Sequence, residues 1–226
     1  MEVGVTEGSS VASAGGEGAV SGRSNSASDA TPVRLFRRRN DWAAWLEKNH
    51  RKSDGLWVRL AKKASRLQSL TYGEALEVAL CYGWIDGQKN SDTDQTWLQK
   101  FCPRSHRSIW SKINRGKALT LIESGIMQPA GLEAVQRAKK DGCWRNAYDS
   151  SSRACVPSDL QAALDANPGA KTFFEGLDRQ NRYAVLFRIQ TVKKAETRAR
   201  KIREFVEMLE RNEKIHESGR PKRSRR

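Results

Sequence analysis

Apolar side chains recur at helical spacing where the orderly part of the chain begins. Asn40 can cap a short helix in which Trp42, Trp45 and Leu46 recur on one face. The turn-forming sequence at residues 53–55, Ser-Asp-Gly, interrupts this pattern. We therefore expect a first helix over roughly residues 40–50.

The spacing of the apolar residues then changes from that of a helix to the alternation typical of a strand. Residues 56–62 alternate, so that their aliphatic side chains share one face, namely Leu56, Val58 and Leu60. Shorter extended segments are expected at residues 84–86 and 96–101, separated by the turn-forming residues 90–94. Together these three segments predict a small antiparallel sheet.

The remaining pattern is that of helices. Thr71-Tyr72-Gly73-Glu74 has the form of a capping box, and the apolar residues that follow it predict a helix ending near Gly83. Beyond Pro103, helix starts and stops recur at Ser108 or Ser111, Gly125, Pro129, Gly142, Pro157 and Asn167-Pro168. Two last apolar stripes, within residues 183–189 and 202–209, predict a long closing helix.

These elements predict an α+β fold that is mostly helical, with a small antiparallel sheet packed with helices and followed by a helical C-terminal subdomain. We expect a disordered Gly- and Ser-rich leader at residues 1–33, an α+β part at 34–149, the helical subdomain at 150–216 and a basic tail at 217–226. No window approaches the roughly 20 apolar residues of a membrane-spanning helix.

The charge adds a nucleic-acid hypothesis. The 226 residues carry a formal net charge of +15, and Lys and Arg can neutralise phosphates. Much of the excess lies near the two ends of the expected fold, where basic runs are usually solvated. One further run could present a basic ridge to nucleic acid or an acidic protein partner: Lys193, Lys194, Arg198, Arg200 and Lys201.

Catalytic and metal-binding motifs are missing from the sequence. The four cysteines form no CxxC pair, the three histidines are far apart, and no phosphate-cradling glycine loop occurs. We therefore predict a non-catalytic protein with no metal and no cofactor, with an enzyme of unidentified reaction as the second alternative. Unpaired cysteines favour the cytoplasm, and the basic tail makes the nucleus the alternative.

An aromatic region offers the main candidate binding site. An Asp among apolar residues, with aromatic and basic side chains nearby, can form a hollow that holds a small anionic ligand. The candidates are Tyr82, Trp84, Asp86, Trp97, Arg104, Trp110, Lys112 and Asn114. The alternative is structural, since Asp86-Gly87 can be an ordinary hairpin turn and two of the three Trp residues can be core.

The segment Pro103–Ser108 is the best anion site within this set. If a helix begins at Ser108, its free backbone N–H groups lie beside the basic side chains of Arg104, His106 and Arg107. Both sets of donors could then bind one phosphate group. An Arg that merely covers a Trp ring is the structural alternative.

Several of these stretches resemble one protein family. The sequence of residues 70–87 is similar to the central signature of the YdeI/OmpD-associated (bacteriocin-protection) family, and residues 101–114, 125–131 and 194–200 are similar to further parts of its pattern. The likeness runs from about residue 34 to 216.

Membership would imply a role in protection against bacteriocins or cationic antimicrobial peptides, or association with an outer-membrane porin. It implies no particular reaction. The leader and the basic tail depart from the compact members of that family.

Overall fold

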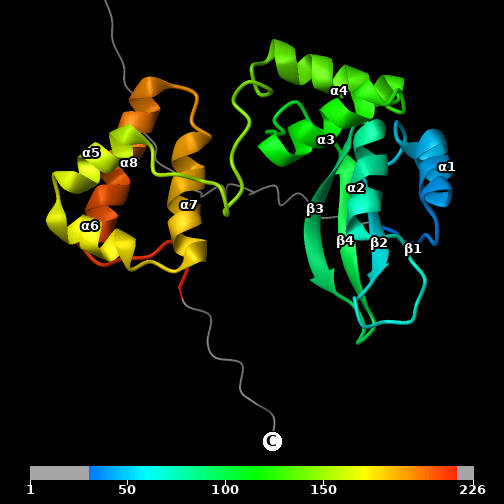
Figure 1. The fold of residues 1–226 in the computed structure, drawn as a ribbon, viewed down its shortest axis with the longest axis horizontal. Helices are drawn as coiled ribbons and strands as arrows, with labels where there is room; N and C mark the ends of the chain where they lie inside the picture. Colours follow the sequence, from blue (N-terminus) through cyan, green and yellow to red (C-terminus); the bar gives the residue numbers. More distant parts are fainter. Residues whose placement is uncertain (1–30, 218–226) are drawn as a thin grey trace, which may run out of the picture. The chain divides into compact units, whose positions relative to one another are not determined.

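The computed structural model describes residues 31–217 and has an α+β architecture dominated by helices (Figure 1). This confirms the predicted fold class. In chain order the elements are β1 (Val33–Leu35), α1 (Arg39–Asn49), β2 (Leu56–Ala61), α2 (Tyr72–Cys81), β3 (Trp84–Ser91), β4 (Thr96–Pro103), α3 (Lys112–Glu123), α4 (Pro129–Lys140), α5 (Ser158–Asp165), α6 (Pro168–Glu175), α7 (Arg179–Gln190) and α8 (Ala195–Glu210). The expected leader and tail fall mainly on residues 1–30 and 218–226, outside the described part.

The sheet has the strand order β1-β2-β4-β3. The three predicted strands pair in antiparallel fashion, with Leu56 opposite Phe101 and Asp86 opposite the same Phe. Strand β1 was not predicted, and it makes the sheet mixed because it runs parallel to β2. Three residues are too few to display an alternating pattern, which explains the omission.

Helices α1 and α2 pack against each other, and aromatic side chains join α1 to the sheet. Trp42 of α1 is fully buried there, with its ring 5.8 Å from that of Phe101 and 6.1 Å from that of Trp84. Its indole Nε1 donates a hydrogen bond to the carbonyl of Ala75 in α2, at 3.0 Å. A buried indole N–H needs such a partner, so this contact fixes α1 against α2.

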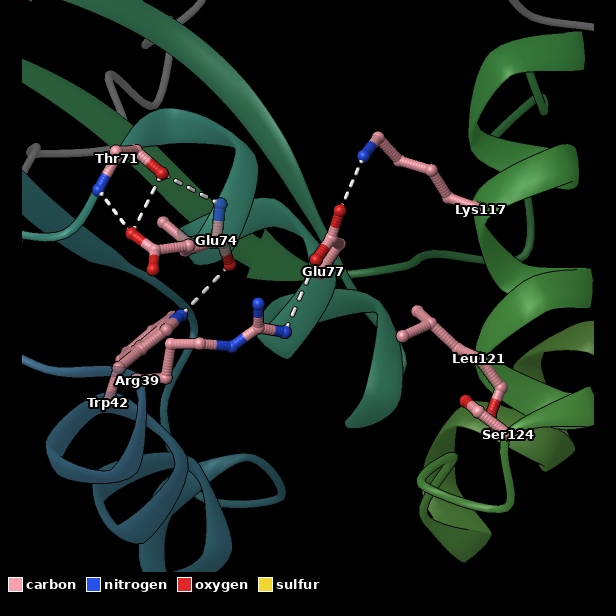
Figure 2. Close-up of polar contacts among 9 residues, drawn as sticks. Arg39, Trp42, Thr71, Glu74, Glu77, Lys117, Leu121 and Ser124 are labelled. Carbon is pink, nitrogen blue, oxygen red and sulfur yellow. Dashed lines mark hydrogen bonds and ion pairs between the residues drawn. The ribbon is translucent and has the colours of Figure 1, made fainter.

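Helix α2 is held at its start and along its exposed side (Figure 2). The capping box forms as predicted, because the Thr71 hydroxyl accepts from the backbone N–H of Glu74 and the Glu74 carboxylate accepts from that of Thr71. One turn further on, the Glu77 carboxylate lies between the Lys117 ammonium of α3, at 2.7 Å, and the Arg39 guanidinium of α1, at 3.2 Å. Three helices are thereby joined at one carboxylate.

Helices α3 and α4 complete the first hydrophobic cluster. Ser111, one of the two caps expected, caps α3 with its hydroxyl accepting from the N–H of Asn114, and Pro129 opens α4 as predicted. Gly131 lies so close to the end of α2 that a Cβ there would meet the carbonyl oxygens of Leu80 and Cys81. A side-chain-free residue is what allows α4 this approach.

The last four helices enclose a second, separate cluster of apolar side chains. Its fully buried members come from all four helices, for example Leu160, Phe174, Ile189 and Leu209. Asn167 caps α6 and Asp178 caps α7 through hydrogen bonds to backbone N–H groups. None of the described helices is long and apolar enough to cross a bilayer.

Candidate functional site

Arg104 directly follows β4 and is buried, with 7% of its surface exposed. Its guanidinium carbon lies 3.6 Å from the centre of the Trp110 ring, which is itself 3% exposed. Its backbone N–H donates to the carbonyl of Gly83, and Nη1 donates to the carbonyl of Ile109 at 3.3 Å. The side chain is therefore held in one place by a stacked ring and a single hydrogen bond.

The other nitrogens of this guanidinium are not satisfied. Nε and Nη2 are both shielded from solvent and have no hydrogen-bond partner among the described residues. Burial lowers the pKa of Arg104 to about 10, and the nearby carboxylate of Asp86 opposes this shift. An unpaired buried cation is costly, so a native fold that retains one usually needs it for something other than stability.

A small hollow lies beside Arg104. Its wall includes Trp110, the second cation Arg137 and one acidic residue, Asp141. Nη2 of Arg137 donates to the Arg104 carbonyl at 3.4 Å. Its free volume of about 10 Å³ admits a single water-sized group. Only the end of a ligand, such as one oxygen of a carboxylate, fits without movement of the wall.

Asp86 lies within β3 and not in a hairpin turn, so the structural alternative put forward for it is wrong. The turn falls later, at residues 92–95, because the polar stretch after Asp86 continues as strand. The Asp86 carboxylate accepts a hydrogen bond from the Tyr72 hydroxyl at 2.8 Å. Burial, followed by this bond, raises the pKa of Tyr72 well above its usual range.

Tyr148 joins this group from a distant part of the sequence. Residues 110–112 and 148 exchange backbone hydrogen bonds, since Tyr148 donates to the Trp110 carbonyl and accepts from Lys112. Burial and the charge of Asp86 raise the pKa of the Tyr148 hydroxyl, whereas Arg104 lowers it. Two tyrosines that sequence reasoning missed thus lie in the electrostatic surroundings of Asp86 and Arg104.

Two other candidates belong to the core. Trp84 is 1% exposed, packs edge-on against Trp42 and Trp45, and donates its indole N–H to the His50 carbonyl at 3.0 Å. Tyr82 is buried beside His50, and burial raises its pKa to about 12. With Trp110 also buried, two of the three Trp residues lie in the core, as the structural alternative held.

Trp97 is half-buried and stands in a different, strongly basic hollow. The Lys89 ammonium lies 4.3 Å from the centre of its ring, and the Tyr72 ring lies 6.1 Å away. The hollow has a volume of about 570 Å³, and none of the described residues that line it is acidic. Its other lining residues are Lys62, Lys63, Asn90 and Ser91. Trp97 is therefore not part of the Arg104 hollow.

Lys112 and Asn114 have local partners. The Lys112 ammonium is 2.7 Å from the Asp149 carboxylate, and Asn114 supplies the capped N–H of α3. Helix α3 begins at Lys112 and not at Ser108, so the Arg104–Ser108 loop does not sit at a helix start as expected. The loop closes on itself instead, through the hydroxyls of Ser105 and Ser108, 3.1 Å apart.

The predicted basic ridge on α8 is largely compensated. Arg198 makes a two-pronged ion pair with Asp159, at 2.6 and 2.9 Å, and Arg200 faces Glu204 at 3.5 Å. Within α8 the four basic residues (Arg198, Arg200, Lys201 and Arg203) are matched by four glutamates (Glu196, Glu204, Glu207 and Glu210). Only Lys193 and Lys194, just before the helix, leave a positive excess there.

Nothing in the described residues resembles a metal site, since no three His, Cys, Asp or Glu side chains converge. Cys81 is buried, and burial raises its pKa to about 11, so its thiol is a packing group.

Two parts of the chain match known family models. Residues 34–134 match a "Domain of unknown function (DUF8412)", and residues 154–212 match "Bacteriocin-protection, YdeI or OmpD-Associated". The resemblance stated from the sequence is confirmed for residues 154–212. The stretches at 70–87, 101–114 and 125–131 that also suggested it fall in the first match. No curated protein and no solved structure matches the chain.

Proposed function

We propose that this chain, whose residues 154–212 match the YdeI- or OmpD-associated bacteriocin-protection family, is a non-catalytic binding protein that holds a small anionic ligand at Arg104. The observation that carries this proposal is the buried guanidinium with two unpartnered nitrogens. A carboxylate or phosphate group is the natural complement of such a group.

The geometry of the free nitrogens favours an oxyanion. Nε and Nη2 form one edge of the guanidinium plane, and this edge can donate two parallel hydrogen bonds to a carboxylate once the wall of the hollow moves to admit its second oxygen. Nη1, on the other side, is already occupied by the Ile109 carbonyl. The Trp110 ring fixes the plane, so little side-chain entropy is lost when a ligand binds.

Calorimetric titration of the full chain with acetate, benzoate and inorganic phosphate tests the proposal. We expect saturable binding of at least one probe and about a tenfold to hundredfold loss in Arg104→Met, because hydrogen bonds to charged groups contribute about 1.5–3 kcal/mol. The matched control is Arg51→Met, which removes an exposed charge and should bind as the parent does. Binding that is absent, or equal in both variants, refutes the proposal.

The stability of the same variants separates a functional Arg from a structural one. Removing an unpaired buried charge leaves a fold as stable or more stable, whereas removing a structural anchor destabilises it. We therefore expect Arg104→Met to unfold at the same or a higher urea concentration than the parent. A clear loss of stability would mean that Arg104 serves the fold.

The family match supports a protective role as the biological setting of this site. Sensitive bacteria that produce the protein should survive a higher dose of a bacteriocin or cationic peptide than cells with an empty vector. Cells producing Arg104→Met should lose this protection if the anion site is needed for it. Equal sensitivity of all three cultures contradicts the protective role but leaves the binding measurement standing.

A second candidate function is the binding of nucleic acid, and the hollow around Trp97 favours it more than α8 does. An aromatic ring beside Lys62, Lys63 and Lys89 can stack a base and meet its phosphates. Affinity for a single-stranded oligonucleotide should then fall in Trp97→Ala more than in Trp57→Ala. Equal affinity of the two variants would mean that the oligonucleotide is bound by nonspecific electrostatic attraction and not at Trp97.

A further inference from the structure

Helix α7 has two apolar faces, and only one of them is needed for the core. Val185 and Ile189 on the inner face are fully buried in the second hydrophobic cluster. The half-buried Tyr183 and Phe187 lie on another face and, with the buried Ala184, line a hollow of about 640 Å³. A soluble helix normally presents polar residues there, so this face is available to a partner.

The floor of this hollow is held in place by neighbouring groups. The Tyr183 hydroxyl donates to the Asp149 carbonyl at 2.9 Å, and the Phe187 ring packs edge-on against Tyr148 with ring centres 5.0 Å apart. The two rings are thereby kept in position before anything binds. Such preorganisation reduces the entropy that association costs.

The rim of the hollow is positive. Arg179 and Arg188 lie at the two ends of the apolar strip, nine residues apart and so separated by about 13 Å along the helix. Neither has a carboxylate partner among residues 31–217, although Nη1 of Arg188 donates to the Ala184 carbonyl. His216 also lines the hollow, and no acidic side chain within residues 31–217 does.

From this arrangement we infer that the α7 face binds an acidic amphipathic segment of a partner protein. Apolar side chains of that segment pack on Tyr183 and Phe187, and its carboxylates pair with Arg179 and Arg188. The hollow opens to the surface, and its lining residues follow α7, which suits a helix laid on a surface. The positive charges of Arg179 and Arg188 are complementary to such a segment, and the net charge of +15 would speed its association. This site does not depend on Arg104.

The probe is a fluorescein-labelled helical peptide with Glu at both ends and Leu or Phe at i, i+3, i+4 and i+7, measured by fluorescence polarisation on the full chain. We expect at least tenfold weaker binding in the double variant Arg179→Glu/Arg188→Glu, because both ion pairs become repulsions. The matched control is Arg200→Glu/Arg203→Glu on α8, which changes the net charge equally. Its affinity should stay within about twofold of the parent, because neither residue lines the hollow.

Two further measurements separate the apolar and charged contributions. Phe187→Ala should bind the peptide more weakly than the parent, and this result counts if the variant has the parent's melting temperature. If the variant is destabilised, the double Arg variant alone tests the inference. A probe with Gln in place of Glu should bind at least tenfold more weakly. Equal loss in the two double variants, equal binding of the Gln probe, or no binding at all overturns the inference.

Discussion

Substitution of Gly131 by Ala tests the packing that positions one wall of the Arg104 hollow. A Cβ at residue 131 would meet the backbone carbonyl of Leu80 at 2.8 Å, and the Cys81 carbonyl and Met127 sulfur still more closely. Two of these three atoms belong to helix backbone, which cannot move without displacing α4 from α2. We therefore expect Gly131→Ala to destabilise the protein.

The magnitude follows from two opposing effects. Overpacking a tight contact costs about 1–3 kcal/mol, and a clash with rigid backbone belongs at the upper end of that range. Replacing Gly by Ala within a helix gives back about 0.5–1 kcal/mol. The net expected loss is on the order of 2 kcal/mol, which lowers a urea midpoint by about 1 M when the slope is about 2 kcal/mol/M.

Gly116→Ala is the matched control, since it lies within α3 and a Cβ there meets nothing within 4 Å. It should raise the free energy of unfolding by the helix-propensity gain alone, about 0.5–1 kcal/mol. Urea unfolding followed by circular dichroism and Trp fluorescence measures both variants. If Gly131→Ala is as stable as Gly116→Ala, the close approach of α4 to α2 is refuted. Because α4 carries Arg137, which lines the hollow beside Arg104, Gly131→Ala should also lower the affinity for a ligand bound there.

Three smaller perturbations address other contacts. Ser111→Ala removes the cap of α3 and should cost about 1 kcal/mol in urea unfolding, with Ser124→Ala, at the other end of the helix, as the comparison. Trp42→Phe loses the bond to Ala75 and part of the packing, and a cost on the order of 2 kcal/mol should appear as a lower melting temperature. The Lys117 ammonium, and then Arg39, lower the pKa of Glu77, so its contribution is present above the unfolded-state pKa of 4.5 and is lost as pH falls through the lower folded-state value. Glu77→Gln should therefore flatten the acid limb of the stability–pH curve by about 1 kcal/mol or less, and an unchanged limb would contradict the role of that carboxylate.

Local sequence signals predicted the elements that have local causes. The capping box at Thr71, the cap at Ser111 and the start of α4 at Pro129 depend on side chains within four residues of the backbone groups they satisfy. The strand at residues 56–61 was visible because one of its faces is buried and the other is not. Its alternation therefore survives in the sequence.

The parts that were missed depend on contacts between distant residues. Strand β3 lies at the edge of the sheet, and its second half is exposed, so residues 87–91 show no apolar alternation. The pairing of Asp86 with Tyr72 and the approach of Tyr148 to Trp110 arise only when β3, α2 and the segment after α4 are brought together. The orphaned edge of Arg104 is likewise a property of the folded chain, because the sequence records which donors exist but not which of them find acceptors.

The two hydrophobic clusters have no side chain in common. The first cluster extends past the match at residues 34–134 as far as Ala147, and the second lies within the match at residues 154–212. We propose that each cluster is an interior of its own, so that the two parts can be inherited, exchanged or fused as modules. Heating should then release two separate cooperative units, each with its own calorimetric peak.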